Sequence, residues 1–142
     1  MEIQAINHVC IVATHLDKTR SFLETMVGCT QHPAMDSWFR IPGSGTTIHV
    51  IDMDDPTVPD DEELFHYYRH TAFEVDDLRE VCRRGVENGY LTFQMDIHGE
   101  ESVIEASDAP LDFGLKTVFV RDPDGNLWEF AQRGLSWEKL WE

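Results

Sequence analysis

Basic side chains are scarce in this sequence, which has 11 Lys and Arg residues against 27 Asp and Glu residues and a formal net charge of −16 at pH 7. A surface of this charge repels the phosphate backbone of nucleic acids and the anionic headgroups of membranes. The composition therefore predicts neither a nucleic-acid partner nor a membrane partner. An acidic surface keeps a protein soluble, but it does not define a function.

Long apolar runs and paired cysteines are missing as well. No stretch approaches the roughly 20 apolar residues that span a bilayer, and residues 1–5 lack the basic and apolar regions of a signal peptide. The three cysteines form no Cys-x-x-Cys motif, and Cys10 sits in an apolar run where a small core residue is expected. These features predict a reduced, cytoplasmic location.

Short motifs of several enzyme classes are also absent. Gly-x-Ser-x-Gly, P-loop and Gly-x-Gly-x-x-Gly sequences do not occur, so a nucleophile-elbow hydrolase and a nucleotide-binding protein have no support. The chain has 142 residues, of which 42% are hydrophobic and 27% are charged. These values predict one globular domain over residues 1–142.

The predicted elements of the first half are a strand, a helix and three strands. In residues 3–53, a strand over Ile3–Thr14 is followed by a helix that Asp17 caps and Gly28 ends. The three further strands are predicted at Thr30–His32, Ser37–Ile41 and Thr46–Asp52.

The second half, residues 67–132, repeats this order. A strand over Tyr67–Val75 is followed by a helix that Asp77 caps and Asn88-Gly89 ends. A long acidic loop through Asp112 and a turn at Asp122–Gly125 separate three more strands, predicted at Leu91–Met95, Lys116–Val120 and Asn126–Gln132. The repeat predicts an α+β fold made of two βαβββ modules.

The segments outside the two modules are short. The acidic segment 54–66 contains prolines and is predicted to be a linker. Residues 133–142 form a tail with Trp137, Leu140 and Trp141 on one side. Together with open sheet edges, these apolar side chains predict a homodimer.

Four candidate metal ligands occupy matching positions in the two modules. His8 and His70 lie on the first strand of each module, whereas His49 and Glu129 each stand four residues after a turn glycine and lie on the last strand. Because side chains alternate across a strand, all four oppose the large apolar residues of their strands. Their neighbours on the same face are small or modest in size: Cys10, Thr47, Ala72 and Ala131. This pattern predicts a concave site rather than a second core.

The chemistry of these four side chains suits a metal ion. Imidazole and carboxylate groups bind divalent Fe, Ni, Zn, Co or Mn. A single His or Glu on a strand is more often a hydrogen-bonded core or surface residue, but four matched positions favour a shared metal site. Two His and one carboxylate also form the ligand set of non-haem Fe(II) enzymes.

The chain resembles the vicinal oxygen chelate superfamily, which includes glyoxalase I, methylmalonyl-CoA epimerase, extradiol dioxygenases, fosfomycin-resistance enzymes and bleomycin-binding proteins. The strongest carrier of the resemblance is Val120–Phe130, with the sequence Val-Arg-Asp-Pro-Asp-Gly-Asn-Leu-Trp-Glu-Phe. The other carriers are the segments 6–9, 16–22 and 69–78.

The resemblance implies paired βαβββ modules whose curved, mixed sheets enclose a divalent metal. It implies that His8, His70 and Glu129 are metal ligands. His49 falls on the remaining ligand position, where glyoxalase I has Glu and the epimerase has Gln, so neither exact activity is implied. Bleomycin-binding members lack these ligands, whereas this chain retains them.

The resemblance thus implies a metal-dependent isomerase or lyase that acts on a small substrate through two neighbouring oxygens, with Glu129 or His49 as the base. One alternative is an Fe(II)-dependent extradiol-type dioxygenase in which His49 acts beside the metal as acid or base. Another is a protein of the antibiotic-binding type that captures a small molecule without turnover. The sequence leaves open the substrate, the metal, whether His49 binds it, and whether the modules pair within a chain or across a dimer.

Overall fold

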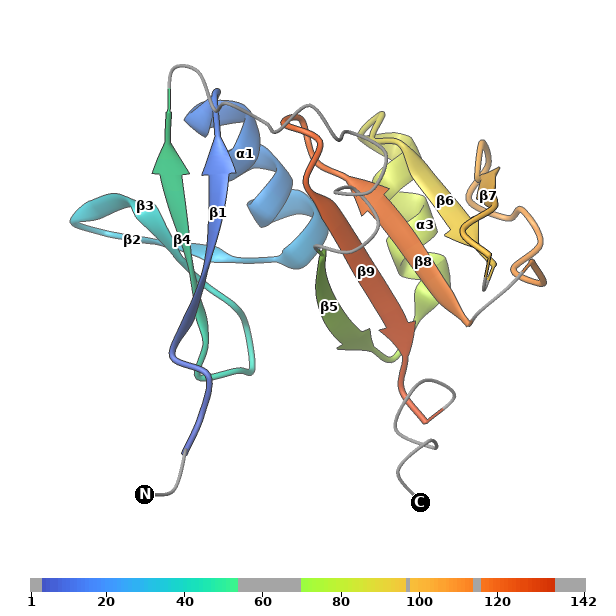
Figure 1. Cartoon of the computed structure of the whole chain (residues 1–142), viewed down its shortest axis with the longest axis horizontal. Helices are drawn as coiled ribbons and strands as arrows, with labels where there is room; N and C mark the ends of the chain where they lie inside the picture. Colours follow the sequence, from blue (N-terminus) through green and yellow to red (C-terminus); the bar gives the residue numbers. More distant parts are fainter. Residues whose placement is uncertain (1–3, 54–69, 97, 114–115, 135–142) are drawn as a thin grey trace. The chain divides into compact units, whose positions relative to one another are not determined.

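The computed structural model describes residues 4–53, 70–96, 98–113 and 116–134. The chain divides into two compact units, Met1–Pro59 and Asp60–Glu142, whose elements are drawn in Figure 1. The predicted linker 54–66, residues 67–69 of the predicted strand over Tyr67–Val75, and the tail residues Trp137, Leu140 and Trp141 lie outside the described residues. No helix among the described residues is long and apolar enough to cross a membrane.

The first unit contains a four-stranded mixed sheet with the strand order β1-β4-β3-β2. Strand β1 pairs in parallel with β4, and the other neighbours are antiparallel. A helical segment, in which α1 continues as the π-helical turn η1, follows β1 in sequence. In chain order the elements are β1 (His8–Ala13), α1 (Leu16–Phe22), η1 (Leu23–Val27), β2 (Thr30–His32), β3 (Met35–Arg40) and β4 (Thr47–Asp52).

The helical segment of the first unit begins at a different residue from the one predicted, but it ends at the predicted glycine. The N-cap residue is His15, whose carbonyl oxygen accepts hydrogen bonds from the backbone N–H groups of Lys18 and Thr19. Asp17, the predicted cap, lies in the first turn, where its carboxylate interacts favourably with the positive end of the helix dipole. Gly28 ends the helical segment with a φ of 76°, a conformation that favours glycine.

The second unit contains a five-stranded mixed sheet with the order β5-β9-β8-β6-β7. Again the first and last strands pair in parallel, so both units repeat one topology, as predicted. Helix α3 packs on β6, β8 and β9 (Figure 1). The elements are β5 (His70–Val75), α3 (Leu78–Glu87), β6 (Thr92–Met95), β7 (Glu101–Val103), β8 (Thr117–Arg121) and β9 (Leu127–Gln132).

The prediction of an uninterrupted acidic loop through Asp112 is wrong, because this segment contains strand β7. Glu101–Val103 extends the sheet by pairing antiparallel with β6, with Met95 opposite Glu101 and Phe93 opposite Val103. It is an edge strand in which no residue is buried. This strand consists of two partly exposed polar residues and an exposed valine, so it lacks the apolar alternation that predicts strands and its composition is typical of a loop. The predicted cap of α3 is confirmed, since the Asp77 carboxylate accepts a hydrogen bond from the Arg79 backbone N–H.

The core of the second unit lies between α3 and one face of the sheet. Trp128 and Phe130 of β9 are buried and, by strand alternation, lie on the face opposite Glu129. Thr92 of β6 is on the α3 side too, because it approaches Gly85 of the helix. With a mixed sheet and helical segments in each unit, the chain has the predicted α+β class.

Gly85 allows α3 to approach β6 closely, and we expect Gly85→Ala to destabilise the protein. A Cβ atom at this position would lie 2.1 Å from Thr92 Oγ1 and 3.2 Å from Thr92 Cβ. Alanine favours a helix over glycine by about 1 kcal/mol, whereas overpacking a core costs about 1–3 kcal/mol. Urea denaturation should therefore show a net loss of up to about 2 kcal/mol in the free energy of unfolding.

The control for this prediction is the second substitution Thr92→Ala. In the Gly85→Ala background it removes the clashing hydroxyl, so the loss for the double variant should be smaller than the sum of the two single losses. A Gly85→Ala variant about 1 kcal/mol more stable than the wild type would show that the helix moves away from β6 without cost.

Candidate metal centre

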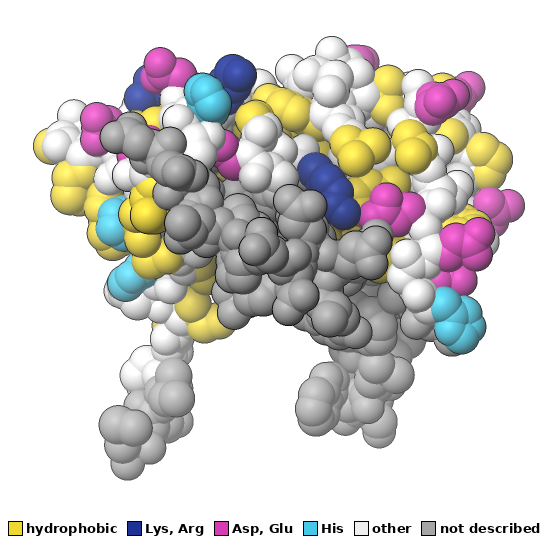
Figure 2. All heavy atoms as spheres, turned by 45° about the horizontal axis from the view of Figure 1, so that its top comes forward, with side chains coloured by type: hydrophobic (Ala, Val, Ile, Leu, Met, Phe, Trp, Pro, Cys, Tyr) yellow, Lys and Arg dark blue, Asp and Glu magenta, His cyan; other side chains and the backbone are white. Residues whose placement is uncertain are grey.

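The first unit places His8 and His49 on one face of its sheet. In the parallel ladder of β1 and β4, His8 is opposite Thr47 and Cys10 is opposite His49. The neighbours Ile48 and Val50 are buried on the other face, so the predicted alternation of apolar and functional residues is confirmed in β4. In Figure 2, histidine side chains of this unit lie beside hydrophobic side chains on the surface.

A hydrogen bond orients the His8 ring. His8 Nδ1 lies 2.9 Å from Asn7 Oδ1. Because an amide oxygen accepts and does not donate, this contact favours the tautomer of the neutral ring that carries its proton on Nδ1 and has its lone pair on Nε2. Metal-binding histidines commonly have such a partner on the second ring nitrogen, which sets the tautomer and the ring orientation.

Trp38 of β3 contacts both histidines. Its ring stacks on His49 with a centroid distance of 4.3 Å and an interplanar angle of 8°. It also meets His8 edge-on, with a centroid distance of 5.2 Å and an angle of 61°. Sequence reasoning missed Trp38, because its proximity depends on the pairing of β3 with β4, in which Trp38 is opposite His49.

Cys10 is not the core residue that the sequence predicts. It is exposed, on the same face of the sheet as His8, and its Sγ lies 3.8 Å from His49 Nδ1. Cys29 and Cys82 are buried. Burial raises the pKa of the Cys29 thiol to about 12 and also raises that of Cys82, so these two thiols stay protonated at neutral pH.

The second unit brings His70 and Glu129 into direct contact. The two residues come from the parallel strands β5 and β9, where Ala72 is opposite Glu129. His70 Nε2 lies 2.9 Å from Glu129 Oε2. The Glu129 side chain is only 5% exposed and that of His70 is 31% exposed. The carboxylate is therefore nearly withdrawn from water, while the imidazole reaches the surface.

The geometry of this pair fits a metal ion. Adjacent ligand atoms around an ion, each at roughly 2.0–2.2 Å from it, lie ~3 Å apart, close to the observed 2.9 Å between His70 Nε2 and Glu129 Oε2. Isolation of a carboxylate from water is unfavourable unless it has charged or hydrogen-bonding partners. An imidazole and an ion together meet that need, and these donors suit the divalent metals predicted above.

The neighbours of Glu129 are larger than the sequence suggests. Ala72 and Ala131 are small, as predicted, but β8 places Phe119 directly opposite Glu129. Phe119 is buried in a cluster with Phe93, Met95 and Leu127. It also meets the His70 ring edge-on, at 6.3 Å and 78°. The surroundings of the pair are thus strongly apolar.

Asp122 shapes the turn before β9. Its buried carboxylate accepts hydrogen bonds from the backbone N–H groups of Asp124 and Asn126, from the Asn126 amide and from Trp128 Nε1, at 2.8–3.2 Å. Burial raises the pKa of the Asp122 carboxyl above its usual range, and the hydrogen bonds of Asn126 and Trp128 act in the opposite direction. This network holds the start of β9, the strand that carries Glu129.

The candidate ligands thus form one pair in each unit. His70 and Glu129 touch each other, whereas His8 and His49 are joined through Trp38. Within the ranges described, no three His, Cys, Asp or Glu side chains form a group that could hold a metal ion. Each pair is therefore half of the predicted ligand set.

Comparison with known families gives a match over most of the chain. Residues 5–130 match the family model described as "Glyoxalase/Bleomycin resistance protein/Dioxygenase superfamily". No curated protein matches the sequence.

Several solved structures share the fold. The oxidase ChaP-H2 has 22% sequence identity and a TM-score of 0.65, covering 96% of this chain and 98% of that one. A mutant of the fosfomycin resistance protein FosX from Listeria monocytogenes, complexed with Mn(II) and dihydroxypropylphosphonic acid, has 19% identity and a TM-score of 0.63, covering 92% and 90%. TnmS3, an antibiotic-binding protein from a Streptomyces species, has 21% identity and a TM-score of 0.59, covering 93% and 98%.

Proposed function

Because the chain belongs to the Glyoxalase/Bleomycin resistance protein/Dioxygenase superfamily, we propose that it is a divalent-metal-dependent enzyme that acts on a small substrate with two neighbouring oxygens. The family match confirms the resemblance to the vicinal oxygen chelate superfamily that the sequence indicates. The activity within the family is the proposal. Its most direct support is the contact of His70 with the buried Glu129.

The proposed ligands are His8, His49, His70 and Glu129. In each unit the ligands come from the parallel pair of first and last strands. Asn7 orients His8, and Trp38 orients His49. The ion would be Fe, Ni, Zn, Co or Mn in the divalent state, and a fold neighbour complexed with Mn(II) is consistent with this set.

When bound, the ion supplies Lewis-acid polarisation of the substrate oxygens. The chain itself supplies the proton-transfer groups. Either Glu129 or His49 removes a proton from the substrate and returns it at another atom, which is isomerase or lyase chemistry. Phe119 and its apolar cluster exclude water around Glu129, which strengthens electrostatic interactions at that carboxylate.

Two other functions are represented among the fold neighbours. Fe(II)-dependent dioxygenation, with His49 as acid or base, is the alternative closest to an oxidase such as ChaP-H2. Capture of a small molecule without turnover is the alternative closest to TnmS3, an antibiotic-binding protein. All four candidate ligand positions carry His or Glu, which favours a metal-dependent enzyme over capture without turnover.

We also propose that the two units form one domain and that the protein is a cytoplasmic homodimer. Light scattering over a wide range of protein concentration tests the oligomeric state. A monomer mass at all concentrations would contradict the dimer.

Identification of the bound metal, together with an activity assay, is the experiment that separates the proposed functions. We expect the purified protein to contain Ni, Zn, Co or Mn by elemental analysis, and to exchange the α-proton of an α-hydroxyketone probe with solvent deuterium, as seen by NMR. Iron together with oxygen uptake in the presence of catechol would replace this proposal with dioxygenation. A protein that contains no metal and retains none after incubation with each ion would support the binding protein instead.

A further inference from the structure

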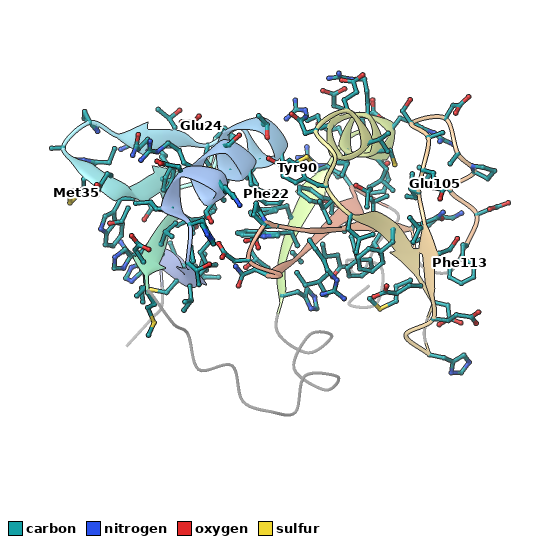
Figure 3. All side chains as sticks on the ribbon, turned by 90° about the horizontal axis from the view of Figure 1, so that it is seen from above. Phe22, Glu24, Met35, Tyr90, Glu105 and Phe113 are labelled. Atoms are coloured by element: carbon teal, nitrogen blue, oxygen red, sulfur yellow. The ribbon has the colours of Figure 1, made fainter. Side chains whose placement is uncertain are left out.

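A cavity of about 510 Å³ lies in the first unit, around β2, β3 and the start of β4. Small-molecule sites in proteins typically have volumes of roughly 300–1,000 Å³. The described residues that line it all lie between Thr30 and Thr47. Met35, labelled in Figure 3, lines it at the turn end of the β2–β3 hairpin.

The cavity differs in charge from the rest of the protein. The chain has 27 Asp and Glu residues, but among the residues that the structure describes none lines the cavity, whereas Arg40 does. Within the described part of the chain, the exposed Arg40 side chain makes no hydrogen bond or ion pair. Its guanidinium presents five donors in a planar fork that matches the oxygens of a carboxylate or a phosphonate.

Strand register connects the cavity with the candidate metal ligands. In the pairing of β3 with β4, Trp38 is opposite His49 and Arg40 is opposite Thr47. Trp38 and Arg40 are two residues apart, so they share a face and lie about 7 Å apart along the strand. Trp38 both lines the cavity and stacks on His49. The cavity therefore adjoins His49 within the first unit.

We propose that this cavity is a substrate subsite in which Arg40 binds an oxyanion, a carboxylate or a phosphonate. Trp38 forms the wall between that subsite and His49. The inference rests on the proposed function and names its substrate class: a molecule with two neighbouring oxygens at one end and an anionic group at the other. Since the net charge of −16 repels anions at long range, recognition of such a substrate requires a local cation.

Catechol and 3,4-dihydroxybenzoate are suitable probes because they differ by one carboxylate and share two neighbouring oxygens. We expect the wild type to bind 3,4-dihydroxybenzoate at least about tenfold more tightly than catechol by titration calorimetry. Arg40→Gln should lose this preference and leave catechol binding unchanged. Arg40→Lys should retain part of it, because lysine keeps the charge without the planar fork.

Lys18→Gln is the matched control, since it removes another positive charge of the first unit from an exposed position on α1. It should retain the full preference. A third probe, 3,4-dihydroxyphenylphosphonate, distinguishes the two oxyanions, because the one bound more tightly by the wild type is the class that the subsite takes.

Titrations with and without added Zn²⁺ separate this inference from the proposed function. A carboxylate preference in metal-free protein depends on Arg40, whereas a gain in affinity for both diols upon addition of Zn²⁺ depends on the metal site. Three results would overturn the inference: equal affinity for catechol and 3,4-dihydroxybenzoate, a preference that survives Arg40→Gln, or no binding of either anion at about 10 mM.

Discussion

The Glu129→Gln variant should fold and lose its metal. The substitution keeps the shape of the side chain but removes the negative charge, and Glu129 Oε2 is the atom that contacts His70 at 2.9 Å. Changes to groups that only orient metal ligands already lower metal affinity by about 10–100-fold. We therefore expect a loss of more than about 100-fold for this proposed ligand, measured by competition with a chelating dye and by elemental analysis.

Glu74→Gln is the matched control for this experiment. Glu74 lies on β5, the strand that carries His70, and its carboxylate is 3.7 Å from Arg133 in a more exposed position. This variant should retain wild-type metal affinity. A Glu129→Gln protein that binds metal as tightly as Glu74→Gln would exclude Glu129 as a ligand.

The same titration on His49→Ala decides the role of His49. Lost metal affinity indicates that His49 is a ligand. Retained metal with turnover about 10²–10⁴-fold lower indicates that it is an acid or base.

Removal of the metal should lower the melting temperature substantially. An ion that binds only the folded state stabilises it by about 2.7 kcal/mol when its free concentration is 100 times the dissociation constant. For a chain of this size, that corresponds to a shift of roughly 6–12 °C. Thermal scans before and after EDTA treatment, and again after metal is added back, measure the shift.

The Glu129→Gln variant also serves as the control for the thermal experiment. Its melting temperature should respond little to EDTA, because it lacks the proposed ligand. Equal shifts in the wild type and the variant would show that the metal stabilises the protein through other residues. No shift in a wild-type protein shown to contain metal would mean that binding and folding are not linked.

Local features of the sequence predicted many of the elements correctly. Gly28 ends the first helical segment because it readily adopts a positive φ, and Asp77 begins α3 because a short carboxylate can accept a hydrogen bond from the helix N-terminus. The alternation of His49 with Ile48 and Val50 correctly predicted which face of β4 is buried. In each case the signal lies within a few residues along the chain.

The errors arose where residue type or the composition of a segment did not indicate the local structure. Cys10 lies among apolar residues in sequence, yet its side chain is on the exposed face of β1. Strand β7 exists because β6 offers it a pairing edge, and its own residues carry no strand pattern. Asp17 is a favourable cap by residue type, but the N-cap is His15, two residues earlier.

The sequence by itself determined the repeated order of elements, the α+β class and the His and Glu positions on the first and last strand of each unit, because periodicity and turn residues are local signals. Only the tertiary structure decided what surrounds those positions. Strand pairing places Trp38 against His49, Phe119 opposite Glu129, and Arg40 in a cavity that no described acidic residue lines. Trp38 and His49 are 11 positions apart in the sequence and Phe119 and Glu129 are 10 apart, beyond the few residues over which local signals act, so it is the pairing of strands that brings them together.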